Sequence, residues 1–145
     1  MEKRYADRVI GRLREEGLKV TPQRIAVVKY LEGNVAHPSV EEIHREVSRD
    51  FPTISLATVY NTLDTLEQIG EVQVVTIDPT RKHYDPETRP HHHLMCTSCR
   101  SIGDVFADYS SVLRVPEELA RQFRVRETSV SFRGVCRGCA EQYPC

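Results

Sequence analysis

The sequence predicts an α+β protein in two small parts, a helical N-terminal part and a β-rich C-terminal part. Three observations predict this organisation. Apolar residues recur with helical spacing as far as Gly70. Two runs of β-forming residues then flank a turn at residues 78–80. Two Cys-x-x-Cys pairs, Cys96/Cys99 and Cys136/Cys139, frame the last part of the chain.

Composition limits the class of protein. The 145 residues are 39% hydrophobic and 28% charged, which is typical of one or two small globular domains. No apolar run approaches the roughly 18 residues of a membrane span. The N-terminus lacks the apolar segment of a secretory signal, so we expect a cytoplasmic protein without membrane contact. The net charge of −1 does not by itself indicate nucleic-acid binding.

The first two predicted helices are marked by their ends. An apolar stripe precedes Gly17, which closes the first helix. Thr21 and Pro22 provide a cap and a first-turn proline for the second helix. The residues expected to face inward are Ala6, Val9, Ile10 and Leu13, then Ile25, Val28 and Leu31.

The third and fourth helices begin with serine caps. Ser39, with Glu42 three residues later, forms a capping box. Ser55 caps a helix that runs to Ile69 and stops at Gly70. The residues expected to face inward are Val40, Ile43 and Val47, then Leu56, Val59, Leu63 and Leu66.

A β-hairpin follows, with strands at residues 72–77 and 81–84. Helices followed by a two-stranded hairpin predict a winged helix-turn-helix DNA-binding domain over residues 1–84, in which the helix at residues 55–69 reads DNA. The alternative is an ordinary solvated helix face and a basic turn. The candidate DNA contacts are Ser55, Thr58, Tyr60 and Asn61 on the helix, and Arg81 and Lys82 at the hairpin tip.

The C-terminal part is predicted as a hinge at residues 85–90 and a small α/β dimerisation and metal-binding domain at residues 91–145. Strands are expected at residues 93–96 and 102–106, and another runs through Val130 and Phe132 to Cys136. A short helix begins at Pro116, with Leu119 and Phe123 inward. These elements are too few to enclose a core, so we expect strands to pair across a symmetric homodimer.

The cysteine pairs predict a structural zinc site on Cys96, Cys99, Cys136 and Cys139. Four thiolates with two-residue spacers suit tetrahedral Zn²⁺, and disulfides are rare in the cytoplasm. The alternative, a redox-active dithiol, lacks the βαβ context of a thioredoxin-like motif. Cys145 is interpreted as a free terminal thiol.

The histidine run predicts a second, different metal site. Because alternate strand residues share a face, His91 and His93 point together and His92 points away. Asp85 and Asp104 offer carboxylates, with Asp108 as the rival to Asp104, and His37 could contribute from the N-terminal part. Imidazoles with carboxylates suit iron or manganese. His44 and His83 are expected to be surface residues.

The chain resembles the ferric uptake regulator family of bacterial metal-dependent repressors over nearly its whole length. The segments that carry the resemblance are residues 21–24 (TPQR), 36–38 (AHP), 55–63 (SLATVYNTL), the histidine run and both cysteine pairs. The resemblance implies a homodimer that binds near-palindromic double-stranded operator DNA, with structural zinc on the four cysteines. It also implies regulatory Fe²⁺ or Mn²⁺ on His37, Asp85, His91, His93 and Asp104.

Within the family, Asp104 and Asn61 favour the peroxide-responsive branch over the iron-sensing branch. The resemblance then implies that peroxide inactivates the iron form by oxidation of His37 or His91. An iron-responsive or other metal-uptake repressor without peroxide sensing is the alternative. A further metal site that some members carry is not expected here, because Pro90, Ser111 and Thr128 stand where those members have ligands and only His92 remains.

An enzyme is the interpretation from a different class. Histidines and carboxylates with an open coordination position also occur in non-haem iron oxygenases and metallohydrolases. No candidate general base accompanies the cluster, and a wing would then have no purpose, so we expect no catalytic activity.

Overall fold

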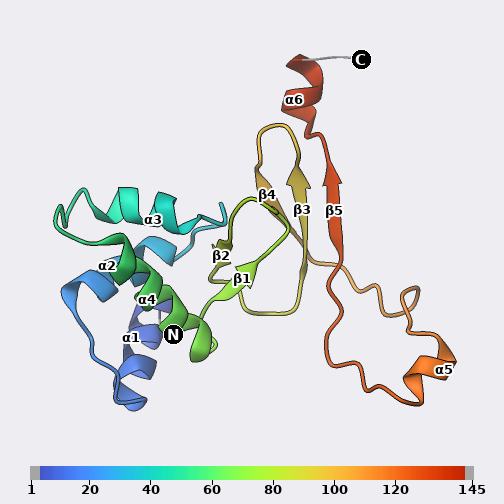
Figure 1. Ribbon diagram of the computed structural model, residues 1–145, viewed down its shortest axis with the longest axis horizontal. Coiled ribbons are helices and arrows are strands. Elements are labelled where there is room, and N and C mark those ends of the chain that lie inside the picture. Colours follow the sequence, from blue (N-terminus) through green and yellow to red (C-terminus); the bar gives the residue numbers. More distant parts are fainter. Residues whose placement is uncertain (1–3, 143–145) are drawn as a thin grey trace. The chain divides into compact units, whose positions relative to one another are not determined.

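The structure is a computed structural model that describes residues 4–142, and the chain divides into two compact units between Arg89 and Pro90 (Figure 1). The first unit contains α1 (Tyr5–Glu15), α2 (Pro22–Leu31), α3 (Val40–Val47), α4 (Leu56–Gln68), β1 (Gln73–Val75) and β2 (His83–Asp85). The second contains β3 (His92–Cys96), β4 (Ile102–Val105), α5 (Glu117–Ala120), β5 (Ser131–Gly134) and α6 (Arg137–Gln142). The predicted α+β class is confirmed.

Three helices of the first unit begin at the predicted caps. The Thr21 side chain accepts the N–H of Arg24, and Pro22 occupies the first turn of α2. The capping box of α3 is complete, because Ser39 and Glu42 each accept the backbone N–H of the other. The Ser55 side chain caps α4 in the same way, by accepting the N–H of Thr58. These side chains satisfy donors that the first turn of a helix leaves without an intrahelical acceptor.

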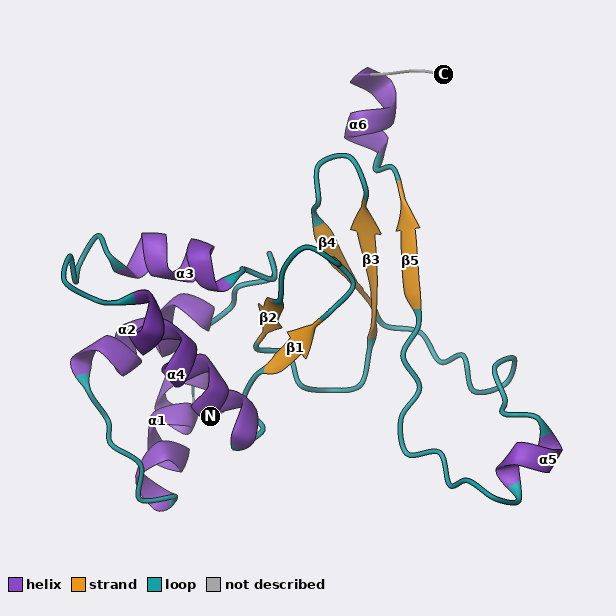
Figure 2. Cartoon of the chain, viewed as in Figure 1, coloured by secondary structure: helices purple, strands orange, loops and turns teal. Residues whose placement is uncertain are grey.

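The core of the first unit lies between the apolar faces of its helices, and the hairpin β1–β2 closes it (Figure 2). Val9, Val28, Ile43 and Leu63 are fully buried, one from each helix, and Tyr84 of β2 joins them. The antiparallel hairpin pairs Val74 with Tyr84 and Gln73 with Asp85.

The second unit is built on a three-stranded sheet in the order β4–β3–β5. β3 is antiparallel to β4 and parallel to β5, so β5 is an edge strand. The long connection from β4 to β5 contains only the single turn of α5. The helix α6 follows β5 and was not predicted from the sequence.

Several expectations about burial and boundaries were wrong. Leu56 is 39% exposed because it is the first residue of α4, one turn before Val59, which is the first residue of this helix to be buried in the core. Leu119 and Phe123 are 54% and 68% exposed, since α5 ends at Ala120 and so forms no helical face that carries both side chains. Asp85 lies in β2 rather than in a hinge.

The remaining boundary differences are smaller. The hairpin strands are three residues each, shorter than predicted. On α2 the buried residues are Val27, Val28 and Leu31, whereas Ile25 is only partly buried.

Candidate metal centres

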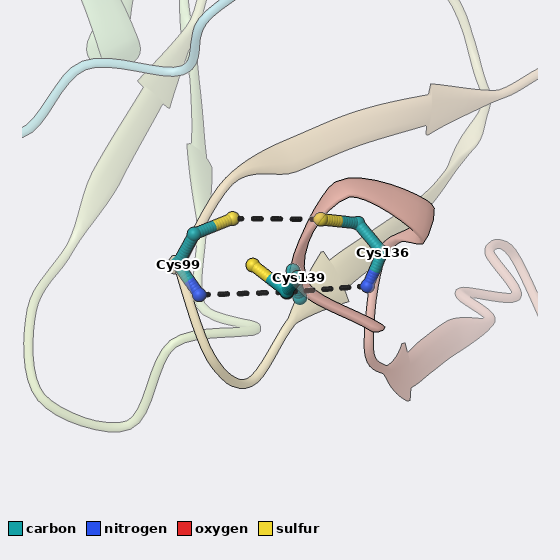
Figure 3. Close-up of side chains that lie close together, drawn as sticks. Cys99, Cys136 and Cys139 are labelled. Atoms are coloured by element: carbon teal, nitrogen blue, oxygen red, sulfur yellow. Dashed lines mark hydrogen bonds between the residues drawn. The ribbon is translucent and has the colours of Figure 1, made fainter. Parts of the chain in front are cut away.

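The four cysteines of the two pairs come together at one end of the three-stranded sheet. Cys96 ends β3, Cys99 lies in the turn that follows, Cys136 precedes α6 and Cys139 lies within it. Their Sγ atoms all lie within 4.8 Å of one another. Figure 3 shows the side chains of Cys99, Cys136 and Cys139 turned toward a common centre. The cluster joins the first strand of the unit to its last helix.

The geometry of this cluster fits tetrahedral Zn²⁺. Zn–S bonds of about 2.3 Å place tetrahedral sulfur ligands roughly 3.8 Å apart, and the Sγ atoms of Cys99 and Cys136 are 3.9 Å apart. The backbone N–H groups of Cys136 and Cys99 donate to the Sγ of Cys96 at 3.3 and 3.4 Å. The four residues therefore form a structural-zinc site.

Electrostatics favour a thiolate at the buried end of this cluster. The two N–H donors, that of Cys136 first, lower the pKa of the Cys96 thiol to about 6. The hydroxyl of Ser101 lowers the pKa of Cys99, whereas the neighbouring sulfur of Cys136 raises the pKa of Cys139 to about 12. A bound zinc ion would replace the hydrogen bonds between the cysteine sulfurs with four metal–thiolate bonds.

A second group of metal-type ligands, the carboxy-terminal donor set, consists of His91, His93 and Asp104. The antiparallel register puts His93 of β3 directly opposite Asp104 of β4. The Nε2 atoms of His91 and His93 lie 3.1 and 3.6 Å from the same oxygen of Asp104. These spacings resemble the roughly 3 Å between adjacent ligand atoms of an octahedral ion with bonds of about 2.1 Å.

His92 and Asp108 have different surroundings. His92 accepts the N–H of Val130 on Nδ1 at 3.1 Å, and its ring lies beside that of Tyr109. Asp108 accepts the N–H of Ser110, and its hydrogen bonds with Ser110 lower the pKa of its carboxyl. The alternation that set His92 apart from its two neighbours is thus seen in the structure.

The first unit holds the amino-terminal donor set, His37 and Asp85. The Nε2 of His37 lies 3.3 Å from the Oδ2 of Asp85, and both side chains are almost completely buried. His37 has a φ of 53°, a left-handed conformation that is uncommon for a residue with a side chain. Asp85 accepts the N–H of Glu87 at 2.8 Å on its other oxygen.

His83 was expected at the surface, and this was wrong. Only 6% of the residue is exposed, because its ring lies between the loop before α3 and the turn between β1 and β2. Its Nδ1 is 2.6 Å from the carbonyl oxygen of His37, and its Nε2 is 3.1 Å from the Oδ2 of Asp78. Hydrogen bonds from Thr80 lower the pKa of Asp78, which therefore stays ionised. Since a carbonyl oxygen can only accept, the Nδ1 of His83 donates to His37.

His44 is also only partly exposed, and its Nε2 is 2.9 Å from the carbonyl oxygen of Ile54. No sequence pattern indicates either contact, since the carbonyl partners lie 46 residues from His83 and 10 residues from His44.

The predicted DNA-contact residues divide into two groups. Ser55 and Thr58 are engaged with each other at the start of α4, where the Ser55 hydroxyl accepts the Thr58 N–H at 3.1 Å. Tyr60 and Asn61 are exposed on the next turn of the same helix. Arg81 and Lys82, the second group, are exposed in the connection between β1 and β2, which Figure 1 shows as a loop. Among residues 4–142, no helix combines the length and the apolar character needed to cross a bilayer.

Comparisons with known proteins identify the family of the chain. The model of the Ferric uptake regulator family matches residues 15–133. The peroxide-responsive repressor PerR of Staphylococcus aureus is 34% identical over 134 residues, which cover 92% of this chain and 90% of that protein.

Two solved structures extend the similarity to the fold. The Helicobacter pylori ferric uptake regulator Fur, described as having three functional metal binding sites, superposes with a TM-score of 0.73 at 25% identity, covering 95% of this chain and 97% of that one. PerR from Streptococcus pyogenes, described as sensing peroxide and regulating genes, superposes with a TM-score of 0.57 at 29% identity, covering 96% and 95%.

Regulators of this family are DNA-binding dimers, and they are not enzymes. The family match spans most of the sequence, and the cysteine cluster and the histidine–aspartate groups supply the metal ligands that such a regulator needs. The chain therefore belongs to the ferric uptake regulator family and is a metal-dependent transcriptional repressor.

Proposed function

We propose that this chain is a homodimeric repressor that binds a near-palindromic operator when Fe²⁺ or Mn²⁺ occupies a regulatory site, and that peroxide inactivates its iron form. The regulatory ligands in this proposal are His37, Asp85, His91, His93 and Asp104. The observation that carries it is the presence of two donor sets, one in each compact unit.

The chemistry of these donors supports iron or manganese. Three imidazoles and two carboxylates suit borderline divalent ions, whereas the thiolates are assembled separately as the zinc site. The amino-terminal donor set offers two ligands and the carboxy-terminal donor set offers three, so neither fills an octahedral shell alone. An ion that takes ligands from both sets fixes the orientation of the DNA-binding unit, which is how metal occupancy would control operator affinity.

The DNA-binding role rests on the first unit. α4 follows α3 as the second helix of a helix-turn-helix, and it presents Tyr60 and Asn61 outward. Arg81 and Lys82 are exposed cations, which supports a role in contacting backbone phosphates. Two copies related by a two-fold axis would read two half-sites, which is why we infer a near-palindromic operator.

Dimerisation is proposed for the second unit. β5 is an edge strand of its sheet, and Phe132 within it and Val135 directly after it are exposed, as are Val112, Leu119 and Phe123 elsewhere in this unit. An edge strand beside exposed apolar side chains is the surface that a second copy would cover.

Peroxide sensing is supported by the similarity to the Staphylococcus aureus peroxide-responsive repressor. Fe²⁺, when bound, can reduce hydrogen peroxide, whereas Mn²⁺ is less reactive toward it. His37 and His91 are the imidazoles expected to gain oxygen, and an oxidised ring would be lost as a ligand. The thiolates would be protected by their zinc.

Operator binding tests this function directly. DNA affinity is measured with no added metal, with Mn²⁺ and with Fe²⁺, and the two metal forms are measured again after hydrogen peroxide. We expect Mn²⁺ and Fe²⁺ to tighten binding by about 5- to 150-fold, and peroxide to abolish the gain for iron only. Peptide mass spectrometry should then locate added oxygen on His37 or His91.

Three results would count against the proposal. Equal operator affinity with and without metal would remove metal control. A peroxide-insensitive iron form would identify the chain as a repressor that responds to iron alone. Oxygen found only on cysteines would show a thiol-based sensor instead.

A further inference from the structure

We propose that His83 and Asp78 are positioning residues that hold the backbone of His37 in the conformation required for metal binding. This inference rests on the proposed function, in which His37 is a regulatory ligand. It assigns a task to a buried pair that neither donates to the metal nor faces DNA.

The contact with His37 is direct and short. The Nδ1–H of His83 donates to the carbonyl oxygen of His37 at 2.6 Å, in a region where His37 is 1% and His83 is 6% exposed. The bond holds the peptide group that follows the His37 α-carbon. It therefore acts on the backbone of the ligand residue itself, and not on a distant part of the loop.

Asp78 fixes the other side of the same ring. Its Oδ2 lies 3.1 Å from the Nε2 of His83, while its Oδ1 accepts the backbone N–H of Thr80 at 2.9 Å and the Thr80 hydroxyl at 2.6 Å. The aspartate is thus anchored in the turn between β1 and β2. With both nitrogens engaged, the imidazole cannot rotate without breaking a buried hydrogen bond.

The surrounding backbone continues the same connection. The Tyr84 N–H donates to the carbonyl oxygen of Pro38 at 3.0 Å, and Ser39 forms an isolated antiparallel bridge with His83. The strand β2 therefore attaches to three consecutive residues, of which His37 is the first. β2 also carries Asp85, so the two members of the amino-terminal donor set are aligned by one strand.

His37 needs this support because of its backbone angle. A φ of 53° brings the β-carbon of an L-residue close to its own backbone, so the conformation persists only where surrounding contacts impose it. The side chain of a ligand follows its α-carbon. If the carbonyl bond is lost, the loop can relax toward ordinary angles, and the Nε2 of His37 would move away from the Oδ2 of Asp85.

Mn²⁺ affinity of the zinc-loaded, full-length dimer tests the proposal by isothermal titration calorimetry. His83→Leu removes both hydrogen bonds, and we expect it to weaken Mn²⁺ binding by about tenfold or more, within the range of typical site coupling. His83→Asn keeps an amide N–H where Nδ1 stands, so it should recover part of the loss. Asp78→Asn is a nearly isosteric change that weakens the interaction with the imidazole of His83. It should show a smaller loss of Mn²⁺ affinity, and it provides a second variant if His83→Leu does not fold.

A matched control is available in the same unit. The Nε2 of His44 also lies 2.9 Å from a backbone carbonyl oxygen, that of Ile54, and Ile54 is not a proposed ligand. His44→Leu should lower the stability of the unit to urea and leave Mn²⁺ affinity unchanged. Zinc content should remain one per chain in every variant.

The outcomes separate this inference from the function on which it rests. If His37→Ala loses Mn²⁺ binding but the His83 and Asp78 variants keep it, the positioning role is wrong and the proposed function stands. If His37→Ala also keeps full affinity, the proposed function fails. If His44→Leu weakens Mn²⁺ binding as much as His83→Leu does, the effect is general destabilisation and the positioning role is again refuted.

Discussion

Replacement of one zinc ligand should unfold the second unit and leave the first intact. Cys139→Ser removes a thiolate from α6, and the remaining three cysteines cannot complete a tetrahedral site of four thiolates. Structural zinc in small domains contributes about 10–16 kcal/mol at neutral pH. The variant therefore loses most of the zinc-binding free energy that stabilises the second unit.

The magnitude follows from how little else holds this unit together. Among the residues that the structure describes, its buried apolar side chains are Met95, Cys96 and Ile102. Full burial stabilises such side chains by about 1.5–3 kcal/mol each, whereas ordering the backbone costs about 1–2 kcal/mol for every residue. The zinc contribution is therefore larger than that of the core, and the unit should not remain folded without it.

Two-dimensional amide NMR combined with metal analysis measures this outcome. Cys139→Ser should contain far less than one zinc per chain, and resonances of β3, β4 and β5 should collapse to unfolded positions. Resonances of α1 to α4 should stay dispersed, because their core is separate. Cys145→Ser, which keeps both Cys-x-x-Cys pairs, is the control and should retain zinc and all native resonances. A zinc-free variant with an intact sheet would refute the reasoning.

Two further predictions concern charge. Hydrogen bonds from Thr80 lower the pKa of Asp78, so its carboxylate stabilises the folded state above its unfolded pKa of about 3.9. In urea titrations, the difference in unfolding free energy between the natural chain and Asp78→Asn should be full near pH 6 and should shrink as the pH falls below about 4. A difference that stays constant with pH would contradict this. The double variant Arg81→Ala/Lys82→Ala removes both positive charges of the hairpin tip. It should weaken operator binding and reduce the slope of log affinity against log salt concentration by about 0.9 for each lost phosphate contact. An unchanged slope would show that the hairpin tip does not touch DNA.

Local signals predicted the first unit well. The capping box of Ser39 and Glu42, the proline at the start of α2 and the apolar stripe of α4 all depend on residues within one or two turns, so a single sequence reveals them. The four-cysteine cluster was equally predictable, since the ligands of a metal site must converge whatever path the chain takes between them.

Non-local contacts account for what was missed. The burial of His83 requires β2 to lie against residues 37–39, and no periodicity in the hairpin encodes that pairing. The parallel pairing of β3 with β5 spans a long connection with little regular structure, so the register could not be inferred. The helical spacing of Leu119 and Phe123 suggested interior positions, but α5 ends at Ala120, before Phe123, and that ring is exposed.

The edge position of β5 links the abundance of this protein to its effect on transcription. In the proposed homodimer a second copy covers β5 and the exposed apolar side chains of the unit, so a single chain is not a competent repressor. At concentrations below the dissociation constant of the pair, doubling synthesis should quadruple the number of competent repressors. Repression would then rise more steeply with the amount of protein than metal binding alone predicts, because the concentration of dimer depends on the square of the concentration of the single chain.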